Sequence, residues 1–513
     1  MLGLAGAGLF VAALDAYLVV TLLPAMITDV GLTIERFEQA TPILTGFLCG
    51  YVIAMPLLGA YSDFRGRAPV YALCVVVFAV GSVVTATAGS LPWLVAGRVL
   101  QGFGGGGLVP LTLALAADLY EDRARTLALG AISGLQEAGS VFGPIYGATL
   151  ASAASAAGGW RFVFWLNVPL AAICAAGLLV ASRDHGNRTA PVDSKGDVAL
   201  TFANRASELA RTFDWKSAGL LGLGLGLLVV ALYPDDPDHR ATSGLFVPLG
   251  ILSLLVLTLY GWRQLRALEP LIPRQLLRSP RFAGVTAANL LIGAALMVAL
   301  VDVPILGRLV FNLDQLASGL LLTQFLVGVP VGAILGGVVA GRIGERVTAV
   351  LGTLLAAAAF LQMSTWPATE LAIRMGPFRS ADIALAACGL GFGIVIAPLA
   401  ATVLQLTRAQ HHGLASSLVV LARVMGMLIG LSALTAFGLF RFRQILGTPQ
   451  LTDPDVRARI EHLGRLVAAA FLQEYREIFT IAAGMCILAA VVIFATIRRD
   501  SSEPALTPSA PQR

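Results

Sequence analysis

Four charged side chains lie deep inside apolar stretches of the sequence, where an ionised group is costly. Asp15 follows LGLAGAGLFVAAL, Arg98 lies in LVAGRVLQGFGGGG, Glu137 in GLQEAGSVFGPIYG and Arg423 in GLASSLVVLARVMGMLIG. Inserting a charge costs about 2.5–3.5 kcal/mol or more, so each group needs an opposite charge, a water-filled cavity or a proton. The chemistry that these residues offer is reversible ion pairing and proton binding.

The sequence carries no pattern that is typical of an enzyme. We find no nucleotide-binding glycine loop, no metal-ligand cluster and no nucleophile elbow. We therefore expect a protein without catalytic activity, with no cofactor and no metal site.

The elements that must position the four charges are membrane-spanning helices. Hydrophobic residues make up 57% of the 513 residues and charged residues only 13%, unlike a soluble globular chain. Apolar stretches of about 20 residues, enough to cross roughly 30 Å of hydrocarbon, recur along the chain. The sequence predicts an all-α polytopic membrane protein with about fourteen spanning helices.

These spans are arranged as six, two and six. The expected parts are an N-terminal six-helix bundle (1–182), a cytoplasmic linker (183–213), two extra transmembrane helices (214–264), a C-terminal six-helix bundle (281–497) and a disordered cytoplasmic tail (498–513). The first span is expected to be retained, because it is too long for a signal peptide and contains Asp15. The five cysteines fall within apolar spans, so no disulfide is expected.

The distribution of arginine predicts the orientation. An even number of spans puts both termini on one side, and that side receives most of the basic loops, among them Arg65, Arg67, Arg123, Arg125, Arg342 and Arg346. By the positive-inside rule this is the cytoplasmic side of a bacterial inner membrane. The net charge of +5 is explained by this topology, and we expect no nucleic-acid partner.

Depth along the predicted helices brings three of the charges into one layer. Asp15, Glu137 and Arg423 lie roughly 15 to 18 Å from the cytoplasmic ends of their helices at 1.5 Å per residue. We expect Glu137, with Asp15 as a second candidate, to pair with Arg423 across the two halves, and protonation of the carboxylate to release the pair. The alternative is a fixed structural ion pair.

Other charged residues lie nearer the ends of the spans. Asp302 and Arg308 are expected to form a surface pair, a candidate periplasmic gate. Asp118, His411 and His412 fall at cytoplasmic helix ends, where solvated or helix-end roles are expected.

Two glycine motifs are candidate gating elements. GAYSDFRGR contributes Gly59, Asp63, Arg65, Gly66 and Arg67 at the end of the second span. The fifth span carries Gly139, Gly143, Pro144 and Gly147, a spacing that lets the helix pack tightly against its neighbour in the other half and bend.

Together with LVAGRVLQGFGGGG, these motifs resemble three signature motifs of the major facilitator superfamily. LDAYLVVTLLP, WRFVFWLNVPL and GLASSLVVLARVMGMLIG resemble its fourteen-helix drug/proton antiporter subfamily. The resemblance covers nearly the whole chain and is closest to the mycobacterial triacylglyceride exporters that work with a periplasmic lipid-binding lipoprotein. It implies two six-helix bundles plus two linker helices, lipid cargo, that lipoprotein as partner, and a part for Arg98 in proton coupling. Two departures are Phe64 after Asp63, where the family has a basic residue, and Gly341, where the second half would have an aspartate.

The expected cavity is apolar. The first, fourth, seventh and tenth helices of the two bundles offer mostly Leu, Val, Ala, Gly and Phe, which suits a lipophilic ligand. We therefore expect a proton-coupled exporter of lipophilic cargo, a triacylglyceride-type lipid or a drug, surrounded by membrane lipids. A multidrug/proton antiporter is the main alternative, and a non-transporting scaffold for a lipoprotein is less favoured.

The last two spans are longer than a membrane requires. The sequence predicts periplasmic helix extensions over about 440–475, forming a projecting hairpin. Its inner apolar stripe would comprise Phe440, Ile445, Val456, Ile460, Leu463 and Val467, and Glu474 would help to keep its outer face soluble. The hairpin would hand over lipid or dock the lipoprotein, or else have no further role.

Overall fold

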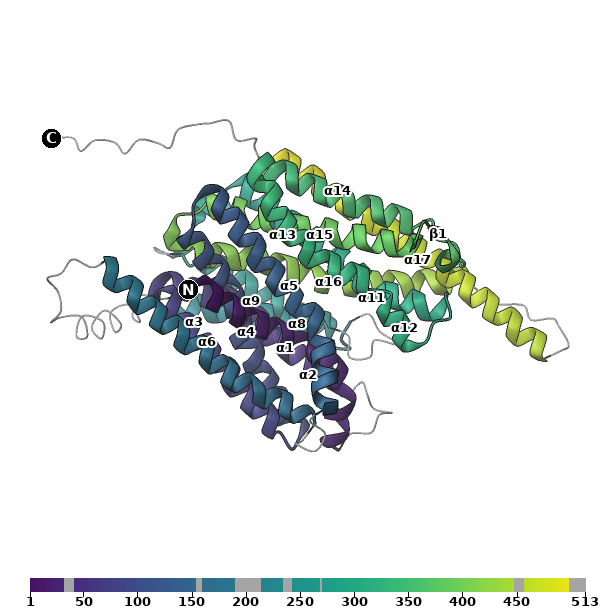
Figure 1. Cartoon of the computed structure of the whole chain (residues 1–513), viewed down its shortest axis with the longest axis horizontal. Coiled ribbons are helices and arrows are strands. Elements are labelled where there is room, and N and C mark those ends of the chain that lie inside the picture. The colour runs from purple at the N-terminus through teal and green to yellow at the C-terminus, as the bar shows by residue number, and fades with distance from the viewer. Residues whose placement is uncertain are drawn as a thin grey trace.

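The computed structural model describes residues 1–31, 41–153, 159–189, 214–233, 242–267, 270–446 and 456–497, and these residues are almost entirely helical (Figure 1). Most of the predicted linker and the whole predicted tail lie outside the described residues. The first half of the chain contains α1 (Leu2–Asp29), α2 (Thr41–Arg65), α3 (Arg67–Thr87), α4 (Leu91–Leu119), α5 (Asp122–Ala153) and α6 (Trp160–Thr189).

Two helices and a short turn of helix separate the halves: α8 (Trp215–Leu232), α9 (Phe246–Arg266) and α10 (Arg274–Leu277). The second half contains α11 (Pro280–Leu309), α12 (Gln315–Leu320), α13 (Thr323–Ile343), α14 (Glu345–Met363), α15 (Ser380–Gln405), α16 (His412–Leu446) and α17 (Val456–Thr496). Between α14 and α15 lie the 3-10 turn η3 (Glu370–Ala372) and a small antiparallel pair, β1 (Arg374–Met375) and β2 (Phe378–Arg379); η4 (Ala409–His411) precedes α16.

The local sequence explains where several helices begin. Gly66 and Gly344 have φ angles of +90° and +88°, which a glycine adopts without strain, and each makes the one-residue turn between two helices. Asp214 and Ser279 cap α8 and α11 through their side chains. The turns at Gly66 and Gly344 thus match each other in the two halves of the chain.

Thirteen described helices are long and apolar enough to cross a membrane, one fewer than the sequence predicted. The exception is α5, whose 32 residues would be sufficient in length. It packs between α1 of its own half and α13 of the other half, so much of its surface faces protein. A helix that is covered by its neighbours can hold glycine and polar residues that a lipid-facing helix cannot.

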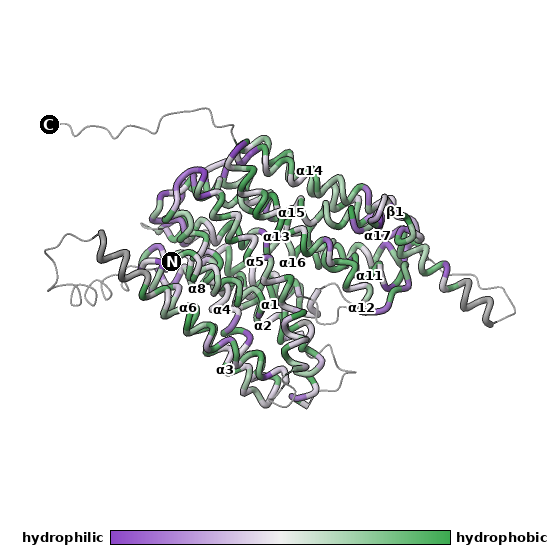
Figure 2. Tube along the Cα trace, viewed as in Figure 1, coloured by the Kyte–Doolittle hydropathy of each residue, from purple (hydrophilic) through white to green (hydrophobic). Residues whose placement is uncertain are grey.

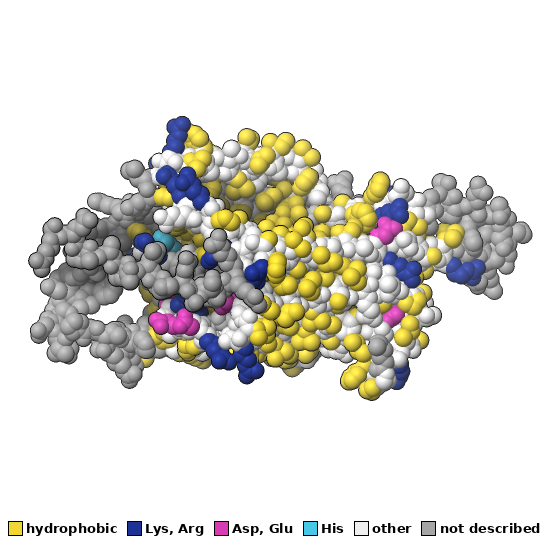
Figure 3. Space-filling view, turned by 90° about the horizontal axis from the view of Figure 1, so that it is seen from above, with side chains coloured by type: hydrophobic (Ala, Val, Ile, Leu, Met, Phe, Trp, Pro, Cys, Tyr) yellow, Lys and Arg dark blue, Asp and Glu magenta, His cyan; other side chains and the backbone are white. Residues whose placement is uncertain are grey.

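Polar residues gather at the two ends of the bundle, and a broad hydrophobic belt lies between them (Figures 2 and 3). We call the end that carries Met1, Arg67, Arg123 and Arg346 the basic end, and the end that carries α12, β1 and β2 the opposite end. The helices of the two halves meet closely near the basic end and diverge toward the opposite end (Figure 1). The contacts between the halves are made mainly by α5 with α13 and by α2 with α16.

The glycines of α5 divide between two faces, which corrects the expectation for the glycine motif. Gly139 and Gly143 pack on the backbone of α1, where an added Cβ would lie 2.7 Å from the Phe10 oxygen and 2.6 Å from the Leu14 oxygen. Gly130 instead packs on α13, with an added Cβ 2.8 Å from the Gly337 Cα. Gly139 follows Gly130 by nine residues, roughly two and a half turns, so the two glycines point in opposite directions. The predicted motif therefore packs within its own half.

The other residues of the motif share this face. An added Cβ at Gly147 would lie 2.9 Å from the Leu18 Cβ, and the carbonyl oxygen of Pro144 accepts a hydrogen bond from Thr21 (3.2 Å). Pro144 therefore also lies on the side of α5 that packs on α1.

Helices α16 and α17 have 35 and 41 residues, more than the roughly 20 that a membrane requires. The N-terminal part of α17 projects beyond the rest of the molecule (Figure 1). The joining segment 447–455 and the side chains of Val456 and Ile460 are outside the described residues. A hairpin that ends in this segment stays a prediction.

Two residues of the extension differ from expectation. Phe440 is 66% exposed and does not face α17; Phe442 does, and stacks on Phe471 with 4.2 Å between ring centroids. Phe442 lies two residues further on, about 200° around the helix. Ile445, Leu463 and Val467 are half-buried. Glu474 is buried rather than solvated, because Gly438 of α16 leaves space for its carboxylate.

Candidate functional site

The structure brings Glu137 of α5 and Arg423 of α16 together. Glu137 Oε1 lies 3.6 Å from Arg423 Nη2, and both side chains keep a little exposed surface. The helix positions place Glu137 and Arg423 about 23 Å and 17 Å from the starts of their helices, well inside the bundle. This ion pair joins the two halves of the chain.

Asp15 does not pair with Arg423. Its Oδ2 accepts a hydrogen bond from Arg98 Nη1 of α4 (2.8 Å), and its Oδ1 accepts from Asn167 Nδ2 of α6 (2.6 Å) and from Gln101 Nε2 (3.3 Å). Asp15 and Arg98 are both fully buried. Depth alone suggested Arg423, but depth does not fix the direction around the helix, and Asp15 points into its own half.

Arg98 is held on several sides within the N-terminal half. Its guanidinium lies over the Phe47 ring, 4.3 Å from the centroid, and Nη1 also donates to Gln101 Oε1 (3.0 Å). Its Nε and Nη2 have no hydrogen-bond partner in the described part of the chain. Asn167 was not identified from the sequence; a lone amide inside WRFVFWLNVPL was the available signal.

At the basic end, Asp63 joins the halves through the start of α16. Its two carboxylate oxygens accept hydrogen bonds from the backbone N–H groups of Gly413 and Leu414, both 2.8 Å. A carboxylate at a helix N-terminus is favourable because the helix dipole is positive there. Gly59, one turn earlier on α2, packs against Gly413, with an added Cβ 2.5 Å from the Gly413 oxygen.

Arg67 connects Asp63 to a second carboxylate. It pairs with Asp63, donates to Asp118 Oδ2 (3.0 Å) and also donates to the carbonyl oxygen of Ala409 (3.1 Å). Asp118 in turn bonds His412 Nδ1 across the halves (2.8 Å). The sequence predicted solvated or helix-end roles for Asp118 and His412. Both lie at helix ends, and His412 is buried in this contact rather than solvated.

Arg65 takes no part in this cluster. Its Nε donates to the Tyr61 hydroxyl (3.1 Å) and its side chain is exposed. In this motif Phe64 follows Asp63, where the family has a basic residue. Arg67, and not Arg65, makes the contacts between the halves. Gly341, at the corresponding place in the second half, packs on the Arg123 side chain instead of supplying a carboxylate.

Asp302 and Arg308 form no ion pair among the described residues, which corrects the predicted periplasmic pair. Arg308 is exposed and Asp302 is half-buried. They are six residues apart on one helix, about one and two-thirds turns, so their side chains point in different directions.

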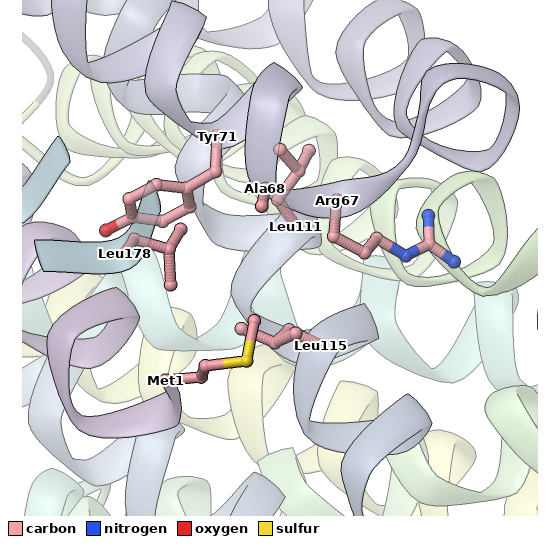
Figure 4. A pocket seen from close by; sticks show the side chains of 7 residues that line it. All are labelled: Met1, Arg67, Ala68, Tyr71, Leu111, Leu115 and Leu178. Atoms are coloured by element: carbon pink, nitrogen blue, oxygen red, sulfur yellow. The ribbon is translucent and has the colours of Figure 1, made fainter. Parts of the chain in front are cut away.

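A small cavity of about 10 Å³ lies inside the N-terminal half near the basic end (Figure 4). Its lining is Met1, Arg67, Ala68, Tyr71, Leu111, Leu115 and Leu178. This volume corresponds to about one water molecule, so the cavity is not a cargo site. In the described part of the chain, no cluster of three or more His, Cys, Asp or Glu side chains is placed to hold a metal ion.

The sequence pattern of the Major Facilitator Superfamily matches residues 5–431. Three similar proteins are triacylglyceride transporters. The one from Mycolicibacterium hassiacum is 38% identical over 97% of this chain and 92% of its own length. The one from Mycobacteroides abscessus is 41% identical over 86% of this chain and 83% of its own, and the one from Mycobacterium tuberculosis is 38% identical over 94% and 91%.

Solved structures with low sequence identity share the fold. The human organic anion transporter MFSD10 has a TM-score of 0.58 and 18% identity, with 96% of this chain and 98% of that chain covered. The proton:xylose symporter XylE, bound to 6-bromo-6-deoxy-D-glucose, has a TM-score of 0.59 and 15% identity, with 96% and 94% covered. These two similarities concern the arrangement of helices alone.

Proposed function

The chain belongs to the major facilitator superfamily, a family of transporters and not of enzymes, and on that premise we propose that it exports lipophilic cargo in exchange for protons. The cargo that we propose is a triacylglyceride-type lipid, which leaves the inner membrane on the periplasmic side. The names of its relatives, which are 36% to 41% identical to it, support the lipid cargo.

The observation that carries the mechanism is the ion pair between Glu137 and Arg423. The pair connects the two halves. These halves must separate at the basic end for a cargo route between them to open on that side. A proton on Glu137 removes the charge that attracts Arg423, so proton binding favours separation. Each elementary charge that crosses the membrane supplies about 2.3 kcal/mol per 100 mV, so the proton gradient can drive this cycle.

The orientation that we propose places the basic end, with both termini, in the cytoplasm. The positive-inside rule supports it, since the loops at this end carry most of the arginines. The contacts of Asp63, Arg67 and His412 then close the cytoplasmic side, while the diverging helices face the periplasm (Figure 1). We propose that the cargo leaves toward the outer leaflet and the periplasm in this state.

The buried charges of Asp15 and Arg98 have a different part in the transport cycle from the pair of Glu137 and Arg423. Their pair is fully buried and lies within one half, so we propose that it holds α1, α4 and α6 in register while the halves move. The route for the cargo is apolar, because α11 has few strongly polar side chains beside Asn289, which bonds its own helix at the Val285 oxygen (3.0 Å).

The projecting part of α17 is the place where we propose that the cargo is received by a periplasmic lipid-binding lipoprotein. Triacylglyceride does not dissolve in water, so an acceptor near the exit is required. The length of α17, 41 residues, supports this assignment because it extends beyond the membrane.

Lipid analysis of cells that lack the protein tests the cargo. Accumulation of neutral lipid in the inner membrane, and its loss from the outer envelope, is expected, with restoration by the intact gene. Unchanged lipids together with lost dye efflux would instead identify a multidrug/proton antiporter. The ion pair between Glu137 and Arg423 would have the same part in the transport of either cargo.

A further inference from the structure

A carboxylate that the mechanism above does not use is buried near the opposite end. Glu474 of α17 is 6% exposed, and its Oε2 has no hydrogen-bond partner in the described part of the chain. Its Oε1 lies against Gly438 of α16, where an added Cβ would clash with it. A buried acceptor without a donor costs about 1–3 kcal/mol, and more when it is charged. This carboxylate therefore requires a hydrogen-bond donor or a positive charge.

A second carboxylate lies at a similar level on a neighbouring helix. Helices α11 and α17 pack side by side and run antiparallel, with Gly284 against Thr496 near the basic end. From that contact, Asp302 is 18 residues along α11 (302 minus 284) and Glu474 is 22 residues back along α17 (496 minus 474). These lengths are about 27 Å and 33 Å, so the two residues lie within roughly one helical turn of the same level. When both are charged, Asp302 and Glu474 repel each other.

The basic side chains nearby are engaged elsewhere. Arg441 of α16 pairs with Glu477 (2.6 Å), and Arg476 donates two hydrogen bonds to the carbonyl oxygen of Trp366 (2.8 and 3.0 Å). In the described ranges, neither Asp302 nor Glu474 forms an ion pair with a basic group.

The remaining titratable neighbour is Tyr475. It follows Glu474 directly in the chain, and its ring packs between Phe471 and Phe479. No cation therefore balances Asp302 and Glu474 in the described part of the chain. Two neighbouring carboxylates in an apolar setting are most stable when they hold one proton between them.

We propose that Asp302 and Glu474 form a proton-binding site that joins α11, α16 and α17. The bound proton supplies the hydrogen-bond donor that Glu474 Oε2 lacks. Loss of that proton leaves two negative charges, whose repulsion loosens α17 from α11 at the opposite end. This site lies in the half of the chain that does not contain Glu137.

The significance of the site for transport rests on the proposed function. In the proposed orientation the site lies on the periplasmic side, where protons enter. It would link proton uptake to the position of α17, the helix that we propose meets the lipid acceptor. The existence of the proton site itself depends only on the residues named here.

Infrared difference spectra of the purified full-length protein, recorded between alkaline and neutral pH, test the site. The carbonyl stretch of a protonated carboxyl group should appear in the wild-type protein. Its intensity should fall by the contribution of one carboxyl group in Glu474→Gln and in Asp302→Asn, each of which should take up about one proton fewer per chain, with no further loss in the double variant. Asp314→Asn, an exposed acid at the same end that caps α12, is the control and should leave the spectrum unchanged.

An unchanged carboxyl band and unchanged proton uptake in the variants would overturn the proposal. Displacement of the proton by millimolar sodium would also overturn it, because the pair would then be a metal-ion site. If Glu474→Gln does not fold, Asp302→Asn carries the test. The measurement uses neither cargo nor a gradient, so a positive result would stand even if transport were not proton-coupled, and a negative result would leave the role of Glu137 untouched.

Discussion

Glu137 Oε1 lies 3.6 Å from Arg423 Nη2, whereas Asp15, also deep in the bundle, is 2.8 Å from Arg98 and also accepts from Asn167. The first distance is too long for a good hydrogen bond, and both side chains keep some exposed surface. The second carboxylate is fully buried and hydrogen-bonded by three side chains. We therefore propose that the pair between the halves is the one that breaks and forms again during transport, and that the pair within one half is fixed.

Asp15→Asn should destabilise the protein more than it changes the coupling of transport to protons. It leaves the Arg98 guanidinium buried without its charge partner, which costs about 3–5 kcal/mol when a buried pair is broken on one side. Thermal unfolding in detergent should show a large fall in midpoint. Combining Asp15→Asn with Arg98→Met should recover part of the loss, and a strictly additive loss would contradict a coupled pair.

His412→Ala should weaken the closure of the basic end without unfolding either half. It removes the bond from α16 to Asp118, while Asp63 still holds the start of that helix. Single cysteines placed between the two halves should become more reactive to a reagent supplied from the side of the basic end, by about two- to fivefold if one hydrogen bond of 0.5–1 kcal/mol is lost. His411→Ala is the matched control, since His411 makes no described contact with Asp118. Equal reactivity of both variants would show that the contact between His412 and Asp118 does not help to close the basic end.

The two glycine faces of α5 should respond differently to added bulk. Gly130→Leu should prevent α5 from seating on α13, so that the basic end stays open while the N-terminal half remains folded. Gly139→Leu should instead lower the thermal stability, because it pushes α1 away within one half. Gly484→Ala, at a site where an added Cβ meets no atom within 4 Å, is the control. The same phenotype in Gly130→Leu and Gly139→Leu would contradict this division.

Shortening α16 and α17 by matching whole turns beyond the membrane, with the joining segment 447–455 kept, should stop delivery of lipid to the envelope. The transmembrane core should still fold, because the cut leaves the packing of α17 on α11 and α14 intact. Envelope lipids and the amount of membrane-inserted protein are the readouts. Export that survives the cut unchanged would show that the extension does not hand over the cargo.

The sequence predicted the helices and the depth of the charges better than it predicted their directions. Hydropathy locates a span, and the rise per residue places Glu137 and Arg423 in one layer. Whether Asp15 points to Arg423 or Arg98 depends on the rotation of each helix and on the packing of six helices at once. The hydropathy of a single span does not contain information on the direction of the Asp15 side chain.

Part of the missing information was present in the sequence. The nine-residue offset between Gly130 and Gly139 assigns them to opposite faces of α5. Glu474 could not have been assigned in this way. Its burial depends on the space left by Gly438 of another helix, and a glutamate in an amphipathic extension otherwise indicates a solvated face.

The central claim is that protonation of Glu137 releases Arg423 and so couples lipid export to the proton gradient. The most direct measurement follows labelled triacylglyceride in proteoliposomes that contain the purified protein, together with internal pH, after a pH gradient is imposed. Wild-type protein and the exposed control Glu121→Gln should move lipid faster with the gradient and pass protons in return; Glu137→Gln and Arg423→Ala, although folded, should lose both responses. Lipid movement that is the same with and without the gradient, or that persists in Glu137→Gln with its proton flux intact, would contradict the account.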